Sequence, residues 1–147
     1  MPQVERTIVI AVTPAIAFDF VADYRNALKW MHNFTRFEPE SPDAYGLGAR
    51  VTVTGTAMGI PMTTTMEING FERPVRLSSR TTGKIVTESS WNFAPEGDST
   101  RATFIGKYDL PGGLIRLVGG NLLQRELETN AEKSLSNLKT QLEASAE

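Results

Sequence analysis

The strongest constraint on the fold is a long amphipathic helix that the last third of the sequence predicts after a series of strands. Its apolar residues recur at intervals of three and four, which places them on one helix face; they are Leu127, Ala131, Leu135, Leu138 and Leu142. At about 1.5 Å per residue, such a helix reaches roughly 40 Å, enough to cross a whole sheet. We therefore expect the stripe to pack on a curved sheet.

The first 40 residues predict a strand, two short helices and a second strand. Val4 to Val12 is rich in β-branched residues, and Thr13-Pro14 then offers an N-cap followed by proline at the first helical position. Asp23 is placed to cap a second short helix from Tyr24 to about Met31. Residues 32–38 predict the next strand.

Five further segments show the alternation of apolar and polar residues that is typical of half-buried strands. They are Arg50 to Met58, Met62 to Phe71, Val75 to Thr82, Ile85 to Phe93, and Thr100 to Leu110. The short separators between them are rich in Gly, Pro, Asn and Asp, which favours hairpins and an antiparallel meander. The predicted order is β-α-α-β-β-β-β-β-β-α, an α+β fold.

Length and charge limit the classes of protein to consider. The 147 residues predict a single domain over residues 1–147, and a net charge of −2 argues against a nucleic-acid partner. The absence of cysteine excludes disulfides and thiolate chemistry. No apolar run is long enough for stable membrane insertion, and the N-terminal segment does not read as a secretory signal. We expect a soluble cytoplasmic protein, monomeric or homodimeric.

Several motifs, in order and spacing, resemble one superfamily across nearly the whole chain. They are the opening Val4-x-x-Thr-Ile-x-Ile10, Pro14 with Phe18-x-Phe-Val21, Asp23 and Trp30, Gly46-x-Gly-x-Arg50, Phe71-x-x-Pro74-x-Arg-Leu77, Thr100-Arg101, Tyr108-x-Leu-Pro-Gly-Gly113, and the closing Ser134-Leu-x-Asn-Leu-Lys139. The sequence is similar to the START/Bet v 1-like (SRPBCC) helix-grip superfamily, in its polyketide cyclase/dehydrase-like group.

That resemblance implies a seven-stranded antiparallel sheet curled around the C-terminal helix, with two short helices after the first strand and a cavity for a hydrophobic ligand. It implies no particular reaction, because the superfamily includes binders, transfer proteins, chaperone-associated modules and a minority of enzymes.

Large, soft and aromatic side chains on the predicted inner faces are the candidate ligand-binding residues. Methionine adapts its shape to variable contents, and Tyr108 with the indole nitrogens of Trp30 and Trp91 would add polar anchors. The candidate set is Trp30, Phe34, Met58, Met62, Met66, Trp91, Phe93, Phe104, Tyr108, Leu114, Leu117 and Val118. For any single one of the residues from Trp30 to Tyr108, a plain core position is the commoner role, and it is the set as a whole that indicates a pocket.

A bulge would exchange the two faces of a strand and so change this assignment. In that case Glu67, Arg76, Arg80 or Glu88 would face the cavity. An inward Arg80 would favour an acidic ligand such as a fatty acid.

The candidates for catalysis are few. His32 is the only histidine, and it and Tyr108 are the weak candidates for proton transfer, although an ordinary packing role suits His32 as well. There is no Gly-x-Ser-x-Gly elbow and no convergent set of metal ligands, so we expect no metal site and no cofactor. Gly46-x-Gly48 reads as a turn rather than a nucleotide loop.

A pair of glycines interrupts the start of the long helix. Gly119 and Gly120 follow Leu114, Ile115, Leu117 and Val118, and each glycine costs a helix interior roughly 1 kcal/mol relative to alanine. One interpretation is a plain kink or a loop between two helices. The other is a flap over the cavity mouth, hinged at the glycines.

Three functions follow from these patterns. The first is a carrier or sensor that binds a small hydrophobic ligand, lipid-like or polyketide-like, between the sheet and the C-terminal helix. The second is a polyketide cyclase, aromatase or dehydratase that uses the same cavity. The third is a protein-interaction module with a collapsed pocket.

Overall fold

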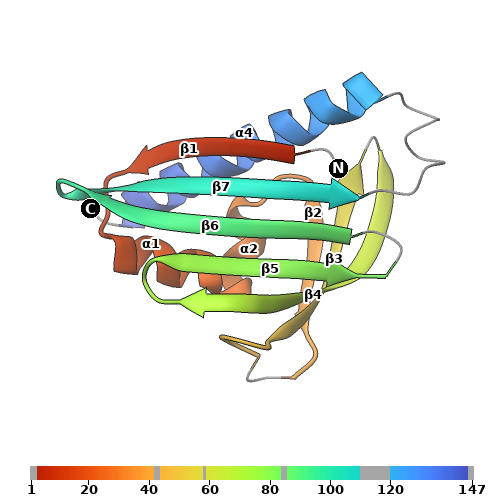
Figure 1. The fold of residues 1–147 in the computed structure, drawn as a ribbon, viewed down its shortest axis with the longest axis horizontal. Coiled ribbons are helices and arrows are strands. Elements are labelled where there is room, and N and C mark those ends of the chain that lie inside the picture. The colour runs from red at the N-terminus through yellow and green to blue at the C-terminus, as the bar shows by residue number, and fades with distance from the viewer. Residues whose placement is uncertain (1–2, 42–43, 58, 84–85, 110–119, 146–147) are drawn as a thin grey trace.

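The computed structural model describes residues 3–41, 44–57, 59–83, 86–109 and 120–145. Within these ranges seven strands form one antiparallel sheet, in the order β1-β7-β6-β5-β4-β3-β2. The sheet is curved, and the long helix α4 lies on the same side of it as the short helices α1 and α2 (Figure 1). This is the helix-grip arrangement, and it confirms the predicted α+β fold.

The elements follow the predicted order. The strands are β1 (Gln3–Ile10), β2 (Phe34–Pro39), β3 (Arg50–Ala57), β4 (Ile60–Glu72), β5 (Arg76–Thr82), β6 (Val86–Glu96) and β7 (Ser99–Asp109). The helices are α1 (Pro14–Ala22), the single 3-10 turn η1 (Tyr24–Asn26), α2 (Ala27–Trp30) and α4 (Gly120–Ser145).

The hairpin between β6 and β7 is tight, as the short separator there predicts. Between β6 and β7, Glu96 pairs with Ser99, so that only Gly97 and Asp98 form the turn. Gly97 has a φ of +60°, in the left-handed region that favours glycine. The N-terminal strand β1 then pairs with β7 at the edge of the sheet. The antiparallel meander is therefore confirmed.

Some boundaries differ from the prediction. The first strand ends at Ile10 rather than Val12, because the carbonyl of Val12 accepts a hydrogen bond from the Thr100 hydroxyl at 2.7 Å, outside the strand pairing. The strand predicted from residue 32 begins at Phe34. Thr13 precedes helix α1, but its side chain makes no capping hydrogen bond.

One bulge interrupts the pairing of β4 with β5. Ile68 pairs with Ser79 and Gly70 with Ser78, which leaves Asn69 as the extra residue. The bulge does not turn the charged residues inward: Arg76, Arg80 and Glu88 are exposed, and Glu67 forms an ion pair with Arg50 at 3.7 Å. The alternative in which these side chains face the cavity is therefore wrong.

Helix α4 buries its apolar stripe on the concave side of the sheet. All five residues of the predicted stripe are buried, and Leu123, only 1% exposed, extends it by one turn. The C-terminal half of the stripe packs with Phe18 of α1 and Phe93 of β6 in one core cluster. The N-terminal half packs with Val4 of β1 in a second cluster. Burial along the stripe is thus what fixes the helix across the sheet.

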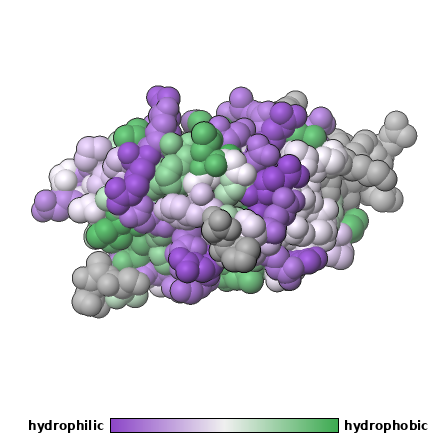
Figure 2. All heavy atoms as spheres, turned by 90° about the horizontal axis from the view of Figure 1, so that it is seen from below, coloured by the Kyte–Doolittle hydropathy of each residue, from purple (hydrophilic) through white to green (hydrophobic). Residues whose placement is uncertain are grey.

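Hydrophilic and hydrophobic residues are mixed on the surface of the molecule. On the face in Figure 2, hydrophilic residues are interspersed with smaller hydrophobic patches. No helix in the described part of the chain has the length and apolar character needed to cross a membrane.

Candidate ligand-binding cavity

A cavity of about 260 Å³ lies between the inner face of the sheet and helix α4. Residues of β2 to β7, of α2 and of α4 line it, and they come from both core clusters. Small-molecule sites in proteins occupy roughly 300–1,000 Å³, so this volume suits a compact ligand. The collapsed pocket expected of an interaction module is not what the described residues form.

The apolar wall of the cavity is an aligned row of side chains. Leu77 of β5 pairs with Trp91 of β6, and Trp91 pairs with Phe104 of β7. The rings of Trp91 and Phe104 lie 5.1 Å apart, and Trp30 of α2 packs edge-on to Trp91 at 5.7 Å. The indole N–H of Trp30 is buried and has no acceptor among the described residues. This end of the cavity is therefore aromatic, and it contains one indole N–H that donates no hydrogen bond to a described residue.

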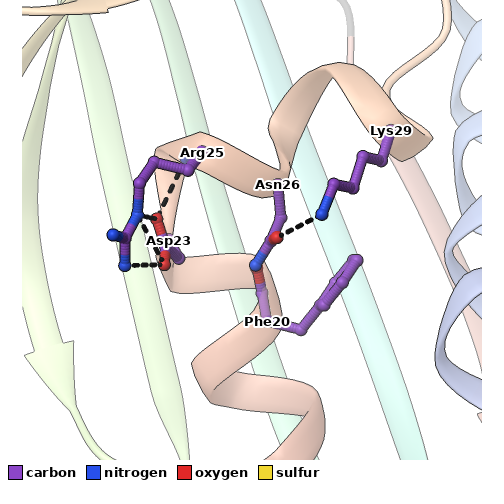
Figure 3. Close-up of polar contacts among 5 residues, drawn as sticks. All are labelled: Phe20, Asp23, Arg25, Asn26 and Lys29. Atoms are coloured by element: carbon purple, nitrogen blue, oxygen red, sulfur yellow. Dashed lines mark hydrogen bonds and ion pairs between the residues drawn. The ribbon is translucent and has the colours of Figure 1, made fainter. Parts of the chain in front are cut away.

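A set of polar contacts lies at the junction between α1 and α2 (Figure 3). The Asp23 carboxylate accepts hydrogen bonds from the backbone N–H of Arg25 at 3.0 Å and from its guanidinium at 2.7 Å. These bonds hold the pKa of Asp23 below its usual value. The Asn26 side chain donates to the carbonyl of Phe20 and accepts from Lys29. The predicted cap at Asp23 is confirmed, but it begins the 3-10 turn η1, and the helix predicted from Tyr24 to about Met31 is divided into η1 and α2.

Helix α4 holds the chain that leaves α2. Three of its polar residues lie four and three residues apart, so they share one side of the helix. Asn137 donates to the carbonyl of Trp30 at 3.2 Å, and Ser134 accepts from the backbone N–H of His32 at 2.8 Å. Asn130 accepts from the side chain of Asn33 at 3.0 Å. These bonds fix the segment that brings Trp30, His32 and Phe34 to the cavity.

Tyr108 lies near the end of β7 and lines the cavity. An added Cβ at Gly106 would lie 2.7 Å from the Tyr108 hydroxyl oxygen and 3.0 Å from Cζ of Phe104, so both rings lean over this glycine. Burial raises the pKa of Tyr108 to about 12. The phenol is therefore neutral at physiological pH and acts as a hydrogen-bond donor or acceptor, not as an anion.

Formal charge is missing from the lining. Among the described residues, no Asp, Glu, Lys or Arg lines the cavity. Nor do any three His, Asp or Glu residues of the described ranges come together in a way that could hold a metal ion. The chemistry that these residues offer to a bound molecule is apolar contact and hydrogen bonding.

Residues 1–143 match the family model described as polyketide cyclase/dehydrase and lipid transport. The chain belongs to this family. No curated protein matches the sequence significantly.

Solved structures share the fold of this family member over nearly its whole length. The crystal structure of TTHA0849 from Thermus thermophilus has a TM-score of 0.83 at 23% identity and covers 99% of this chain and 100% of its own. The Zhui aromatase/cyclase from Streptomyces sp. R1128 has a TM-score of 0.79 at 14% identity, covering 99% and 95%. Ara h 8.0201 has a TM-score of 0.69 at 10% identity, covering 95% and 96%. At these identities the likeness concerns the fold.

Most of the candidate residues predicted from the sequence meet at the cavity of this polyketide cyclase/dehydrase and lipid-transport family member. The lining includes His32 together with Trp30, Phe34, Met62, Met66, Trp91, Phe104 and Tyr108. Phe93 does not line it: its ring stacks on Trp91 at 5.8 Å and meets Phe18 edge-on, because α1 covers this end of β6. Met58, Leu114, Leu117 and Val118, and with them the expected flap, lie outside the described residues.

The sequence prediction missed the small hydroxyl residues of the lining. Ser79 and Thr81 on β5, and Thr87 and Ser89 on β6, face the cavity. The alternation of the strands does predict their position, because they lie two and four residues from Leu77 and Trp91 on the same strands and therefore share the inner face. The prediction omitted them because it considered only large apolar and aromatic side chains.

Proposed function

We propose that the chain binds a small hydrophobic molecule in the cavity between the sheet and α4, as a carrier or sensor. The observation that carries the proposal is the open apolar cavity of about 260 Å³ against the aromatic row. Apolar walls that face an unfilled space lose dispersion contacts, and a ligand of matching shape restores them. Membership of a family described by polyketide cyclisation and lipid transport agrees with this role.

Native mass spectrometry of the purified protein tests the proposal, with chemical analysis of any molecule that copurifies. We expect a protein–ligand mass from the unmodified chain. Met66→Trp, which adds bulk inside the cavity, should stay folded and lose that mass. Thr63→Trp places the same side chain on the outer face of the same strand, where Thr63 is exposed, and should keep it. Equal ligand retention by the two variants would place the ligand elsewhere and reject the proposal.

A second candidate function is polyketide cyclisation or dehydration. It is supported by the presence of both His32 and Tyr108 in the lining, and by the likeness in fold to an aromatase/cyclase. Under this function the cavity fixes the conformation of a poly-β-ketone chain, while a neutral side chain transfers a proton. His32→Ala or Tyr108→Phe should then abolish turnover of such a substrate and leave the unfolding temperature unchanged. Turnover that survives both substitutions would reject this candidate.

A further inference from the structure

The inner face of strands β5, β6 and β7 carries two adjacent rows of different chemistry. The first row is the apolar one formed by Leu77, Trp91 and Phe104. One step further along the same face, Ser79 pairs with Ser89, and Ser89 pairs with Gly106. Side chains directly opposite each other on antiparallel strands have Cβ atoms about 4.5–5.5 Å apart. The two serines are therefore neighbours beside the aromatic wall.

The hydroxyl of Tyr108 completes this second row. Gly106 has no side chain, and the Tyr108 ring leans over it, so that its oxygen lies 2.7 Å from where a Cβ of residue 106 would be. Because Gly106 pairs with Ser89, the phenol comes beside the Ser89 hydroxyl. We call Ser79, Ser89 and Tyr108 the hydroxyl row.

The hydroxyl row differs from the neighbouring threonine pair in its hydrogen bonding. No described residue forms a hydrogen bond with the side chain of Ser79, Ser89 or Tyr108, although all three line the cavity. The next pair behaves differently, because the Thr81 hydroxyl accepts from the backbone N–H of Thr87 at 2.8 Å. All three side chains are half-buried, so water that enters the cavity can bond to their hydroxyls, and a bound molecule that displaces this water has to supply the partners instead.

The charge of the lining limits what that molecule can be. No lysine or arginine among the described residues lines the cavity, and the Arg80 side chain is exposed on the outer face. An ionised carboxylate buried at the hydroxyl row would lose its hydration without gaining a lysine or arginine partner. A hydroxyl or a carbonyl would meet three neutral partners instead. Burial keeps the pKa of Tyr108 at about 12, so the row itself remains uncharged.

We propose that the hydroxyl row binds the polar end of an uncharged ligand, a molecule with a hydroxyl or carbonyl group on an apolar or aromatic body, and that the cavity excludes carboxylates. The apolar body then packs on Trp91 and Phe104. The inference rests on the proposed function and adds to it the chemical class of the ligand.

Three probes of one shape test the inference: naphthalene, 2-naphthol and 2-naphthoate. They share the ring system and differ only in the polar group, and at pH 7 the first two are uncharged while the third is an anion. In calorimetric or fluorescence titrations of the full chain we expect 2-naphthol to bind about tenfold more tightly than naphthalene, the equivalent of one or two net hydrogen bonds. The naphthoate should bind more weakly than naphthalene.

Substitutions within the row connect that preference to named atoms. The double variant Ser79→Ala/Ser89→Ala and the single variant Tyr108→Phe should reduce the naphthol preference over naphthalene to about twofold or less, while the affinity for naphthalene itself stays within about twofold. Ser90→Ala, on the same strand but outside the lining, is the matched control and should keep the full preference. The ligand-free unfolding temperature should not fall in the double variant, because the removed hydroxyls have no partners to lose.

The results of the titrations distinguish a failure of the hydroxyl-row proposal from a failure of the proposed ligand-binding function. Binding of naphthalene with no preference for naphthol, or binding of the naphthoate as tight as that of naphthol, overturns the inference and leaves a hydrophobic ligand site. Failure of all three probes to bind contradicts both. A drop in the ligand-free unfolding temperature of the double variant, with the naphthol preference unchanged, would assign the serines a structural role and reject the row as a binding site.

Discussion

At the scale of single residues, Gly106 decides how the cavity is shaped. A Cβ at this position would come within 2.7 Å of the Tyr108 oxygen and 3.0 Å of Phe104. We predict that Gly106→Ala costs about 1–3 kcal/mol in the free energy of unfolding, as for other overpacked cores, and displaces the Tyr108 ring. Urea unfolding followed by tryptophan fluorescence measures the loss.

A second substitution, at Tyr108, tests whether the phenol ring causes the stability loss of Gly106→Ala. Because the closest contact is with the phenol oxygen, adding Tyr108→Phe to Gly106→Ala should recover part of the lost stability. Double-mutant coupling between contacting residues is commonly about 0.5–3 kcal/mol. Strictly additive effects of the two substitutions would show that the ring does not lean over residue 106.

The ion pair between Asp19 of α1 and Arg73 predicts a pH dependence. Two hydrogen bonds of 2.7 Å join the carboxylate to the guanidinium, and they hold the pKa of Asp19 below its usual value. A lowered pKa means that the pair stabilises the fold above the pKa of the unfolded chain and that this contribution is lost as the pH falls through the folded pKa. Both side chains are about half exposed, so solvent screening keeps the contribution of the pair small.

Asp19→Asn should therefore be less stable than the unmodified chain at pH 7, and the difference should be smaller near pH 2.5, below the usual pKa of an aspartate. Urea unfolding at the two pH values measures this difference, and a double-mutant cycle with Arg73→Gln isolates the pair from other effects. A stability difference that persists unchanged at low pH would mean that Asp19 acts through something other than its charge.

At the scale of the elements, helix α4 depends on its buried stripe. Leu138 is fully buried among α1, the sheet and the rest of the stripe, whereas Leu122 on the same helix is 54% exposed. We predict that Leu138→Ala lowers the free energy of unfolding by about 2–5 kcal/mol. Leu122→Ala removes the same atoms and should change it by less than about 0.5 kcal/mol. Similar losses from both, measured by urea unfolding, would contradict the packing of α4.

The elements are also where prediction from sequence succeeds best. The helix stripe, the Asp23 cap and the short hairpin separators are local signals, and each corresponds to an element in the structure. The misplaced boundaries have tertiary causes: the Val12 carbonyl bonds to Thr100, far along the chain, instead of continuing β1. Such a partner cannot be read from the residues around Val12.

The candidate site is predictable only in part, for the same reason. Large side chains with the right alternation, such as Trp91 and Phe104, are assigned to the cavity because hydrophobic periodicity marks the inner face. Phe93 has the same periodicity, and only the position of α1 removes it from the lining. Ser79 and Ser89 become visible as a site only when the register places them side by side.

At the scale of the whole molecule, the curved sheet and the helices surround the cavity, and we propose that a small ligand fills it. Both tryptophans of the chain line that cavity, and the Trp30 indole N–H has no acceptor among the described residues. The two indole N–H signals in a ¹H–¹⁵N spectrum are therefore reporters that lie inside the proposed site.

The most direct test is a ¹H–¹⁵N titration of the full chain with 2-naphthol. We predict saturable shifts of both indole signals and of amides on the inner faces of β5, β6 and β7, while amides of the exposed Gly97-Asp98 turn stay in place. Unchanged indole signals at saturating 2-naphthol, or shifts confined to the outer face of the sheet, would contradict the claim that the cavity is the ligand site.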